Sequence, residues 1–286
     1  MTKTQGARAA SHAKHGAAQE AWETVKTIVY ALLIALVIRT LLFQPYTIPS
    51  ASEEPNLYTG DYIIVSKWSY GYSRHSILFS PPVFNGRLFF HAPTRGDTIV
   101  FKLPSSGHVD YIKRLVGLPG DRVQVRGDRL YINDKMLKLH QIEVGANEYL
   151  GDDAPVLWYQ ETNPEGRTYT IQHLPARAND PGVEAANNTG VYVVPPHCYF
   201  MMGDNRDNSE DSRFSPGLAP EDPKLRNCGS GATDFLPASA GVGFVPEENL
   251  VGKAQIIMIS WKEGSAFFKP WTWLNLRWDR FARWIK

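Results

Sequence analysis

The longest run of apolar residues lies near the N-terminus, in the segment WETVKTIVYALLIALVIRTLLF at residues 22–43. A helix over these residues would rise about 33 Å at about 1.5 Å per residue, enough to cross the hydrocarbon core of a bilayer. Arg39, close to the end of the run, can extend its guanidinium to the interface. The pattern predicts one transmembrane anchor over 22–43, with a cleaved signal peptide or a buried core helix as the alternatives.

Basic residues are distributed unevenly around this anchor. Residues 1–21 are small, polar and mildly basic without a hydrophobic period, so we expect a flexible cytoplasmic tail there. Four basic residues precede or begin the apolar run, whereas residues 44–70 contain only Lys67. The positive-inside rule therefore keeps the N-terminus in the cytoplasm and exports everything after Phe43.

The exported part is a succession of β-branched and aromatic runs separated by Gly, Pro, Asn and Asp. These runs are YTIPS, DYIIVSKW, GDTIVFKL, VDYIKRLVG, DRVQVRGDRLYIND, TYTIQHL, GVYVVPP, CYFMMGD and AQIIMISW. Their lengths and boundaries are typical of strands, and no amphipathic helix longer than about ten residues interrupts them. A parallel α/β sheet is therefore disfavoured, and we expect a mainly β, antiparallel exported domain.

The pattern also divides the exported part into segments. Residues 44–136 and 191–265 form the expected β-domain, with a β-rich insertion at 137–190 and a second polar, turn-rich stretch at about 214–242. Residues 266–286 are amphipathic, with four of the chain's eight Trp, five basic residues and one acid. A helix here would place an aromatic and a basic stripe in a membrane interface, or would dock on its own domain.

Composition excludes several classes of protein. A formal net charge of +1 argues against general nucleic-acid binding, which requires a surplus of Lys and Arg. The eight His are scattered without metal-ligand spacing, and no phosphate-binding loop or dinucleotide fingerprint occurs, so we expect no metal and no cofactor. The two cysteines, Cys198 and Cys228, are too few for a disulfide scaffold, but an exported domain is oxidised and a disulfide between them is possible.

Three segments of the exported part could carry chemistry. Residues 47–57, TIPSASEEPNL, place two serines in a turn bracketed by prolines, just after the membrane segment. Residues 110–121, DYIKRLVGLPGD, place Lys113 between apolar neighbours on one face of a strand. Burial would lower the pKa of this lysine, so that its amine could accept a proton near neutral pH. An edge lysine that reaches solvent is the alternative.

The third segment is MMGDNRDNSEDSR at residues 201–213, which follows an apolar strand. Its spacing does not fit an EF-hand loop, which requires acids at alternate positions and a Glu at the twelfth. It could be a solvated loop, or it could hold a catalytic group in place through a hydroxyl and a carboxylate–guanidinium pair.

Together the three segments resemble the boxes of the bacterial type I signal peptidases, also called leader peptidases. The serine box appears as PSASEEPNL, the lysine box as DYIKRLVGLPGD and the C-terminal box as GDNRDNSEDSR, followed by GFVPEENLVGKA. The resemblance covers about residues 40–135 and 190–262. It implies a β-barrel-like catalytic domain carried by one N-terminal transmembrane helix.

The resemblance also implies a serine endopeptidase with a Ser–Lys dyad. Ser52 would be the nucleophile and Lys113 its general base, with the Ser50 hydroxyl and the Ser52 backbone N–H stabilising the oxyanion. Ser209 would hydrogen-bond the lysine, and Asp211 and Arg213 would form the supporting pair behind it. The residues implied to bind substrate are Ile48, Pro49, Tyr111 and Ile112.

The implied substrates are preproteins with small side chains at −1 and −3 of the signal peptide, met as they emerge from the export machinery. The implied location is the bacterial inner membrane, in contact with lipid, with the catalytic domain on the periplasmic side.

One departure from the family pattern bears on activity. Glu53 stands where the family has Met, and a carboxylate near Lys113 would raise the pKa of the lysine and oppose its activation. Asn56 replaces the usual Thr, a milder change. Two other functions stay open: a catalytically impaired, membrane-tethered binding module, and a Ser–His–Asp hydrolase that uses His108 or His197.

Overall fold

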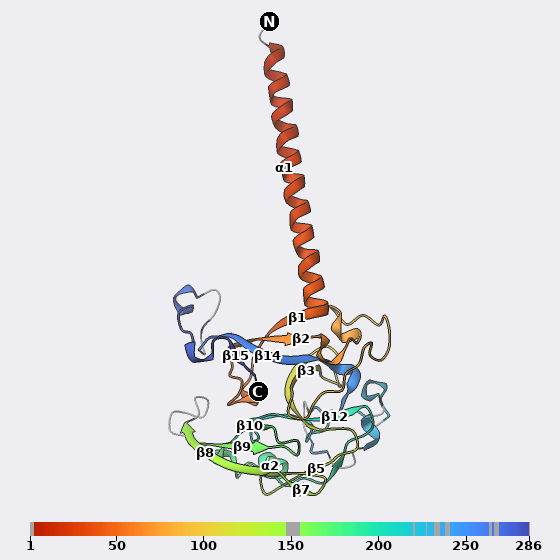
Figure 1. The fold of residues 1–286 in the computed structure, drawn as a ribbon, viewed down its shortest axis with the longest axis vertical. Coiled ribbons are helices and arrows are strands. Elements are labelled where there is room, and N and C mark those ends of the chain that lie inside the picture. The colour runs from red at the N-terminus through yellow and green to blue at the C-terminus, as the bar shows by residue number, and fades with distance from the viewer. Residues whose placement is uncertain are drawn as a thin grey trace.

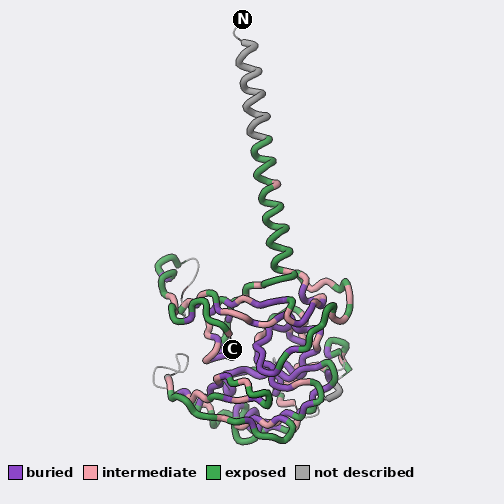
Figure 2. Tube along the Cα trace, in the orientation of Figure 1, coloured by how far each residue is buried: buried purple, intermediate pink, exposed green. Residues whose placement is uncertain are grey.

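A long helix and a β-rich body make up the computed structural model of this chain (Figure 1). It describes the chain except residues 1–2, 147–154, 220, 227, 232–234, 238–240, 263–264, 266–268 and 286. Helix α1 spans Lys3–Val37 and continues into a π-helical turn at Ile38–Leu42. The part over Gln19–Leu42 is long and apolar enough to cross a membrane, and its side chains are almost all exposed (Figure 2).

The expectation of a flexible tail over residues 1–21 is wrong from Lys3 onward, because the helix begins there. This stretch contains seven Ala, two Lys, two Gln and one Glu, all of which favour helices. It also adjoins a long apolar helix, so each added residue extends an existing helix and no new nucleus is needed.

The β-rich body is antiparallel throughout its strand pairs, as the sequence predicts. The main sheet has eight strands in the order β1-β2-β14-β3-β4-β12-β13, with β15 paired to β14. Its strands are β1 Phe43–Thr47, β2 Asp61–Ser66, β3 Thr98–Lys102, β4 Asp110–Gly117, β12 Cys198–Met202, β13 Val245–Pro246, β14 Leu250–Ser260 and β15 Arg283–Trp284. Strand β14 comes late in the chain but pairs with both β2 and β3, so it joins the N-terminal strands to the rest of the sheet.

Two smaller sheets complete the body. One has the order β11-β5-β6-β7 and the other β10-β9-β8. Their strands are β5 Arg122–Arg126, β6 Arg129–Ile132, β7 Lys135–Met136, β8 Lys138–Ala146, β9 Pro155–Thr162, β10 Thr168–His173 and β11 Tyr192–Val193. The three-stranded sheet and the short helix α2, Pro181–Ala186, lie within residues 137–190.

Buried side chains run through the interior of the body (Figure 2). Strand β4 contributes side chains to two apolar clusters. Leu115 packs in one cluster with Ile99 and Phe101, and the next residue, Val116, packs in the other with Val123. This alternation is the two-residue period of a strand that is covered on both faces. The backbone around Lys113 is thereby held on both sides.

The helix expected over residues 266–286 is not formed in the described part of that segment. Single 3-10 turns occur at Pro270–Thr272 and Trp278–Arg280, and β15 pairs with β14. Arg280 is buried and its Nε donates to Asp61 Oδ1 at 3.0 Å, so this segment docks on the domain by a buried ion pair. Trp271, at 75% exposure, and the similarly exposed Trp278 and Trp284 remain on the surface.

The two cysteines form a disulfide, which links Cys198 at the start of β12 to Cys228 across 30 residues. Closing a loop of this length in the unfolded chain stabilises a fold by about 3–4 kcal/mol in the chain-entropy account.

We predict that the denatured, unreduced protein has no free thiol and that the Cys198→Ser, Cys228→Ser double variant melts several degrees lower. Two titratable thiols before reduction would contradict this pairing.

Candidate active site

Ser52 lies in a 3-10 turn, Ala51–Glu53, that directly follows strand β1. Ser50 before the turn is extended and exposed, whereas Ser52 is nearly buried. Two bonds from Asn205 hold the turn: its backbone N–H donates to the Ser52 carbonyl at 3.1 Å and its side-chain amide donates to the Ala51 carbonyl at 3.0 Å. The Ser52 hydroxyl is therefore presented from a fixed backbone.

Lys113 reaches this hydroxyl from strand β4. Its Nζ donates to Ser52 Oγ at 2.6 Å and to its neighbour's carbonyl, Ile112 O, at 2.9 Å. The side chain is buried, and no carboxylate hydrogen-bonds its ammonium among the described residues. Burial lowers the pKa of Lys113 below its ordinary value, although the negative charges of Glu53, Asp211 and Asp204 act in the opposite direction. The geometry and the pKa shift are those of a base that can take the Ser52 proton.

Ser50 and Ser209 also lie close to Ser52. The Oγ atoms of Ser50 and Ser52 are 3.5 Å apart, so the Ser50 hydroxyl borders the space in front of the dyad. Both Ser209 and the Ser52 backbone pack against Gly203. The Ser209 hydroxyl, however, is buried and has no hydrogen-bond partner among the described residues, so it does not bond Lys113 as the resemblance implies. The two hydrogen bonds that Lys113 Nζ makes go instead to the Ser52 hydroxyl oxygen and the Ile112 carbonyl oxygen.

Asp211 and Arg213 form a fully buried ion pair behind Gly203. The guanidinium donates to both carboxylate oxygens at 2.9 Å, and the Gly203 backbone N–H donates to Asp211 at 3.1 Å. Burial alone would raise the pKa of Asp211, but Arg213 and the backbone donors hold that pKa below its ordinary value. Asp211 therefore stays ionised and fixes the strand end that carries Gly203.

A second buried ion pair, which sequence reasoning did not single out, joins β4 to the same loop. Arg114 donates to both oxygens of Asp204 at 2.7 Å, and both side chains are about 1% exposed. Asn56 donates to Asp204 at 2.7 Å and to the Thr170 carbonyl at 2.6 Å, so the same cluster also holds the segment after Ser52. Two features of the sequence could have indicated this pair: Arg114 is adjacent to Lys113, and Asp204 is the acid of the GDN sequence.

Glu53 points inward. It is 0% exposed, and neither carboxyl oxygen has a hydrogen-bond partner among the described residues. Burial, reinforced by the negative charge of Asp204, raises the pKa of Glu53 well above its ordinary value, against the smaller opposing effects of Lys113 and Arg114. Burial therefore shifts Glu53 toward its protonated form, whereas any negative charge that it keeps raises the pKa of Lys113.

Of the four residues implied to bind substrate, Ile48 and Pro49 follow β1 just before the Ser52 turn, and Tyr111 and Ile112 lie on β4 beside Lys113. Ile48 is buried and the half-buried Ile112 packs against the same apolar cluster. Pro49 is exposed and Tyr111 is half-buried, with the Lys113 ammonium 5.7 Å from the centre of its ring. Segments 48–52 and 111–113 are thus brought together from distant parts of the chain.

The histidines expected in a Ser–His–Asp site lie elsewhere. His108 is exposed before β4, and His197 pairs with Glu247 at 3.0 Å. Within the described ranges, no histidine hydrogen-bonds Ser52. No group of three or more His, Cys, Asp or Glu side chains in this part of the chain is arranged to hold a metal ion.

Comparison with known proteins gives concordant results. A family model described as signal peptidase, peptidase S26, matches residues 21–261. The chain is 41% identical over 239 residues to a signal peptidase I of Rickettsia typhi, covering 82% of this chain and 79% of that protein. It is 39% identical over 255 residues to a signal peptidase I of Rickettsia akari, covering 88% and 83%. A solved signal peptidase I of Enterococcus faecalis aligns with 57% of this chain and 97% of its own at 26% identity, with a TM-score of 0.28.

Gly203 is the point where the Ser52 turn and the C-terminal box touch. A Cβ added there would lie 2.3 Å from Ser209 Oγ and 2.5 Å from the Ser52 carbonyl oxygen. We predict that Gly203→Ala lowers kcat of peptide cleavage at least tenfold, because the Ser52 backbone must move. The matched control is Gly182→Ala in α2, whose Cβ would meet nothing within 4 Å and which should keep full activity. Equal activity of the two purified variants would show that the turn tolerates the displacement.

Proposed function

The chain belongs to the signal peptidase family S26, whose serine endopeptidases remove signal peptides from preproteins, and we propose that Ser52 and Lys113 perform this cleavage as nucleophile and general base. The observation that carries the proposal is the 2.6 Å hydrogen bond from a buried lysine amine to the Ser52 hydroxyl. The retained pairing of Asp211 with Arg213 also supports it, because a chain that only binds has no need of this arrangement.

The reaction proceeds by acyl transfer. Neutral Lys113 takes the Ser52 proton as Oγ attacks the scissile carbonyl, and the oxyanion is held by the Ser52 backbone N–H and the Ser50 hydroxyl. The Lys113 ammonium then protonates the leaving amine, and an acyl-enzyme ester remains on Ser52. Water, deprotonated by the same lysine, hydrolyses this ester and restores the hydroxyl.

We also propose which substrates this site accepts and where in the cell the enzyme lies. The apolar surroundings of Ile48 and Ile112 suit small residues at −1 and −3 of the signal peptide. The helix over Gln19–Leu42 anchors the enzyme in the inner membrane, with its N-terminus in the cytoplasm and the β-domain on the periplasmic side, where preproteins emerge from the export machinery.

Replacing either member of the dyad tests the mechanism. We predict that Ser52→Ala and Lys113→Met each lower kcat by about a thousandfold or more in detergent solution, because the two groups act as a unit. His108→Ala and His197→Ala should keep wild-type activity. Wild-type activity should rise with pH, with an apparent pKa below that of an exposed lysine, because the base works only when deprotonated. Cleavage by Lys113→Met at the wild-type rate would refute the dyad.

Glu53 has a separate test in the same assay. If its carboxyl is neutral, Glu53→Gln removes no charge beside Lys113, and the midpoint of the rising pH limb should move by less than about half a unit. A midpoint about one unit lower or more would show that Glu53 is ionised and raises the pKa of the lysine. An inert wild type that gains activity in Glu53→Met would instead favour the impaired binding module.

A further inference from the structure

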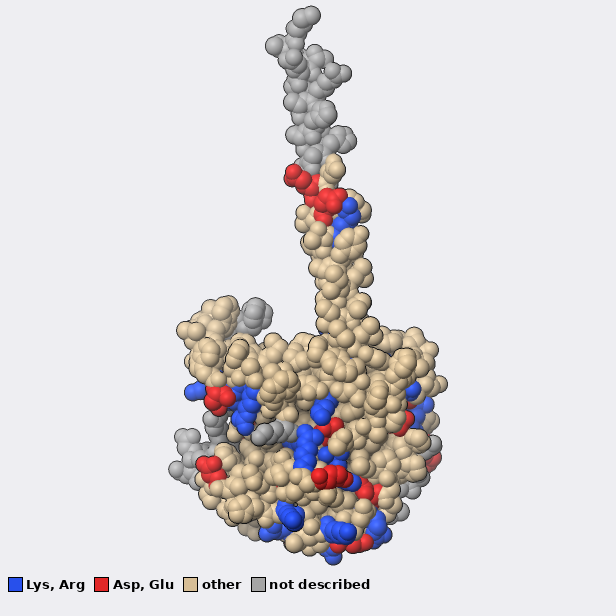
Figure 3. All heavy atoms as spheres, in the orientation of Figure 1, with Lys and Arg blue, Asp and Glu red and all other residues tan. Residues whose placement is uncertain are grey.

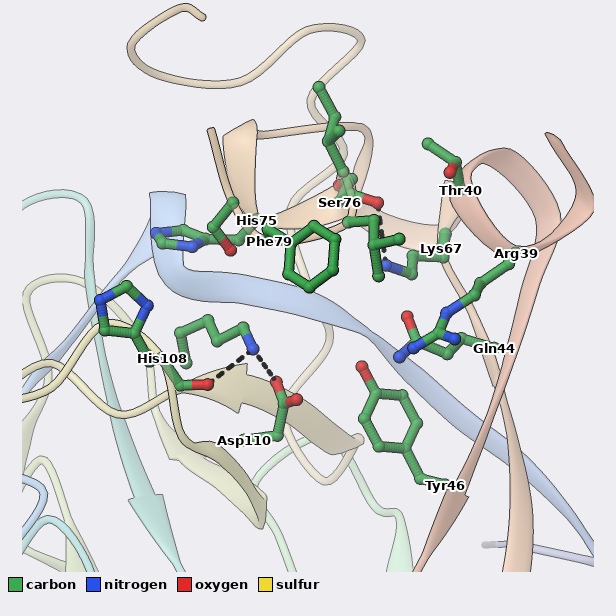
Figure 4. A pocket seen from close by; sticks show the side chains of 14 residues that line it. Arg39, Thr40, Gln44, Tyr46, Lys67, His75, Ser76, Phe79, His108 and Asp110 are labelled. Carbon is green, nitrogen blue, oxygen red and sulfur yellow. Dashed lines mark hydrogen bonds and ion pairs between the residues drawn. The ribbon is translucent and has the colours of Figure 1, made fainter. Parts of the chain in front are cut away.

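A cavity of about 440 Å³ lies where the membrane helix meets the β-domain (Figure 4). It is separate from Ser52 and Lys113, and neither of these residues lines it. Its polar lining comes from the end of the helix, from β1 and from the segments around β2 to β4. The ionisable lining residues that the argument concerns are Arg39, Lys67, His75, Lys102 and Asp110.

The end of the helix is fixed relative to this cavity. The Lys67 backbone N–H donates to the Leu42 carbonyl at 2.9 Å, and the Tyr72 hydroxyl donates to the Leu41 carbonyl at 2.7 Å. These carbonyls are among the last of the helix and would otherwise lack partners. Arg39, one turn earlier, is thereby placed at the cavity, and Figure 4 shows its guanidinium and the Lys67 amine directed into the same space.

Positive charge in the cavity exceeds negative charge. Lys102 pairs with Asp110 at 3.0 Å, and Asp110 is the only acid in the lining. Arg39 has no hydrogen bond or ion pair in the described part of the chain, and Lys67 Nζ donates only to the Ser76 carbonyl, at 3.0 Å. Burial lowers the pKa of His75 to about 3, so this ring stays neutral. Burial lowers the pKa of Lys67 only to about 8, so its amine stays mostly charged at neutral pH, and neither Arg39 nor Lys67 forms an ion pair with a described carboxylate.

The surface beside the cavity is apolar. Phe79, which lines the cavity, is 87% exposed, and Leu78, Val83, Leu88 and Phe89 nearby are also exposed. On the one face of the molecule that Figure 3 draws, no charged side chain is in view around the base of the helix, whereas charges gather further down the body; the view does not include the face with the cavity. An apolar rim at the end of a membrane helix lies at the depth where lipid headgroups meet acyl chains.

We propose that this cavity binds the phosphate headgroup of an acidic phospholipid, with Arg39 and Lys67 as its counterions and the acyl chains against Leu78 and Phe79. A phosphodiester supplies one negative charge and several acceptor oxygens for the unpaired donors. A zwitterionic headgroup would bring its own ammonium toward Lys102 and lose part of this attraction. The inference rests on the proposed membrane anchor, and the test distinguishes failure of the anchor from failure of the headgroup site.

The test uses the full chain reconstituted in phosphatidylcholine vesicles that contain spin-labelled phosphatidylglycerol or spin-labelled phosphatidylcholine. The fraction of label immobilised by the protein gives the relative association of the two lipids. We expect the wild type to favour phosphatidylglycerol and Arg39→Gln to lower that preference about fivefold, the factor expected for one basic side chain at a membrane surface. Lys135→Gln on the exposed strand β7, far from the helix, is the matched control and should change nothing.

Every other outcome overturns the proposal. Equal association of both lipids, or an unchanged preference in both Arg39→Gln and Lys67→Gln, would show that no headgroup site exists here. Displacement of the labelled lipid by millimolar inorganic phosphate, but not by chloride of equal ionic strength, would assign the cavity to free phosphate. Flotation of the vesicles without protein would refute the anchor itself, whereas bound protein without lipid preference refutes only the headgroup site.

Discussion

The buried ion pair between Arg114 and Asp204 is the interaction on which the site depends. Arg114 and Lys113 are adjacent on β4, so their side chains leave opposite faces of the strand, and both are removed from water. A buried cation is tolerated when it is paired and hydrogen-bonded, and Arg114 meets this condition through both oxygens of Asp204. Lys113 has no carboxylate hydrogen-bonded to it among the described residues, and burial lowers its pKa below the ordinary value. One strand thereby carries a structural cation and, at the preceding position, the lysine that we propose as the base.

The same ion pair also connects the three sequence segments. Asp204 belongs to the loop after β12, and it binds Asn56 beyond the serine turn as well as Arg114 on β4. Asn205, the next residue, holds the carbonyls of Ala51 and Ser52. Loss of the pairing would therefore release the Ser52 turn and leave a buried charge uncompensated. The Arg114–Asp204 pair therefore both positions Ser52 and stabilises the loop after β12.

The membrane helix is joined to this arrangement through the sheet. Strand β1 begins directly after the helix and ends just before the Ser52 turn, and it pairs with β2 along its length. The hydrogen bonds of Lys67 and Tyr72 to the end of the helix add a second connection. The Ser52 turn thus lies a single strand's length from the end of the helix. A preprotein whose signal peptide lies in the membrane would present its cleavage site at a comparable depth.

The sequence determined the local features of this protein: the apolar helix, most strands of the body, the three chemical segments and the antiparallel class. Each follows from a periodicity or a spacing within a few residues. It misjudged residues 3–21, where helix propensity extended the anchor, and residues 266–286, where the buried pairing of Arg280 with Asp61 prevailed over helical spacing. Only the tertiary structure decided that Glu53 points inward, that β14 lies between β2 and β3, that Asp204 pairs with Arg114, and that the Ser209 hydroxyl does not hydrogen-bond Lys113. These outcomes depend on which side chains from distant segments exclude water together, and that is a property of packing rather than of local pattern.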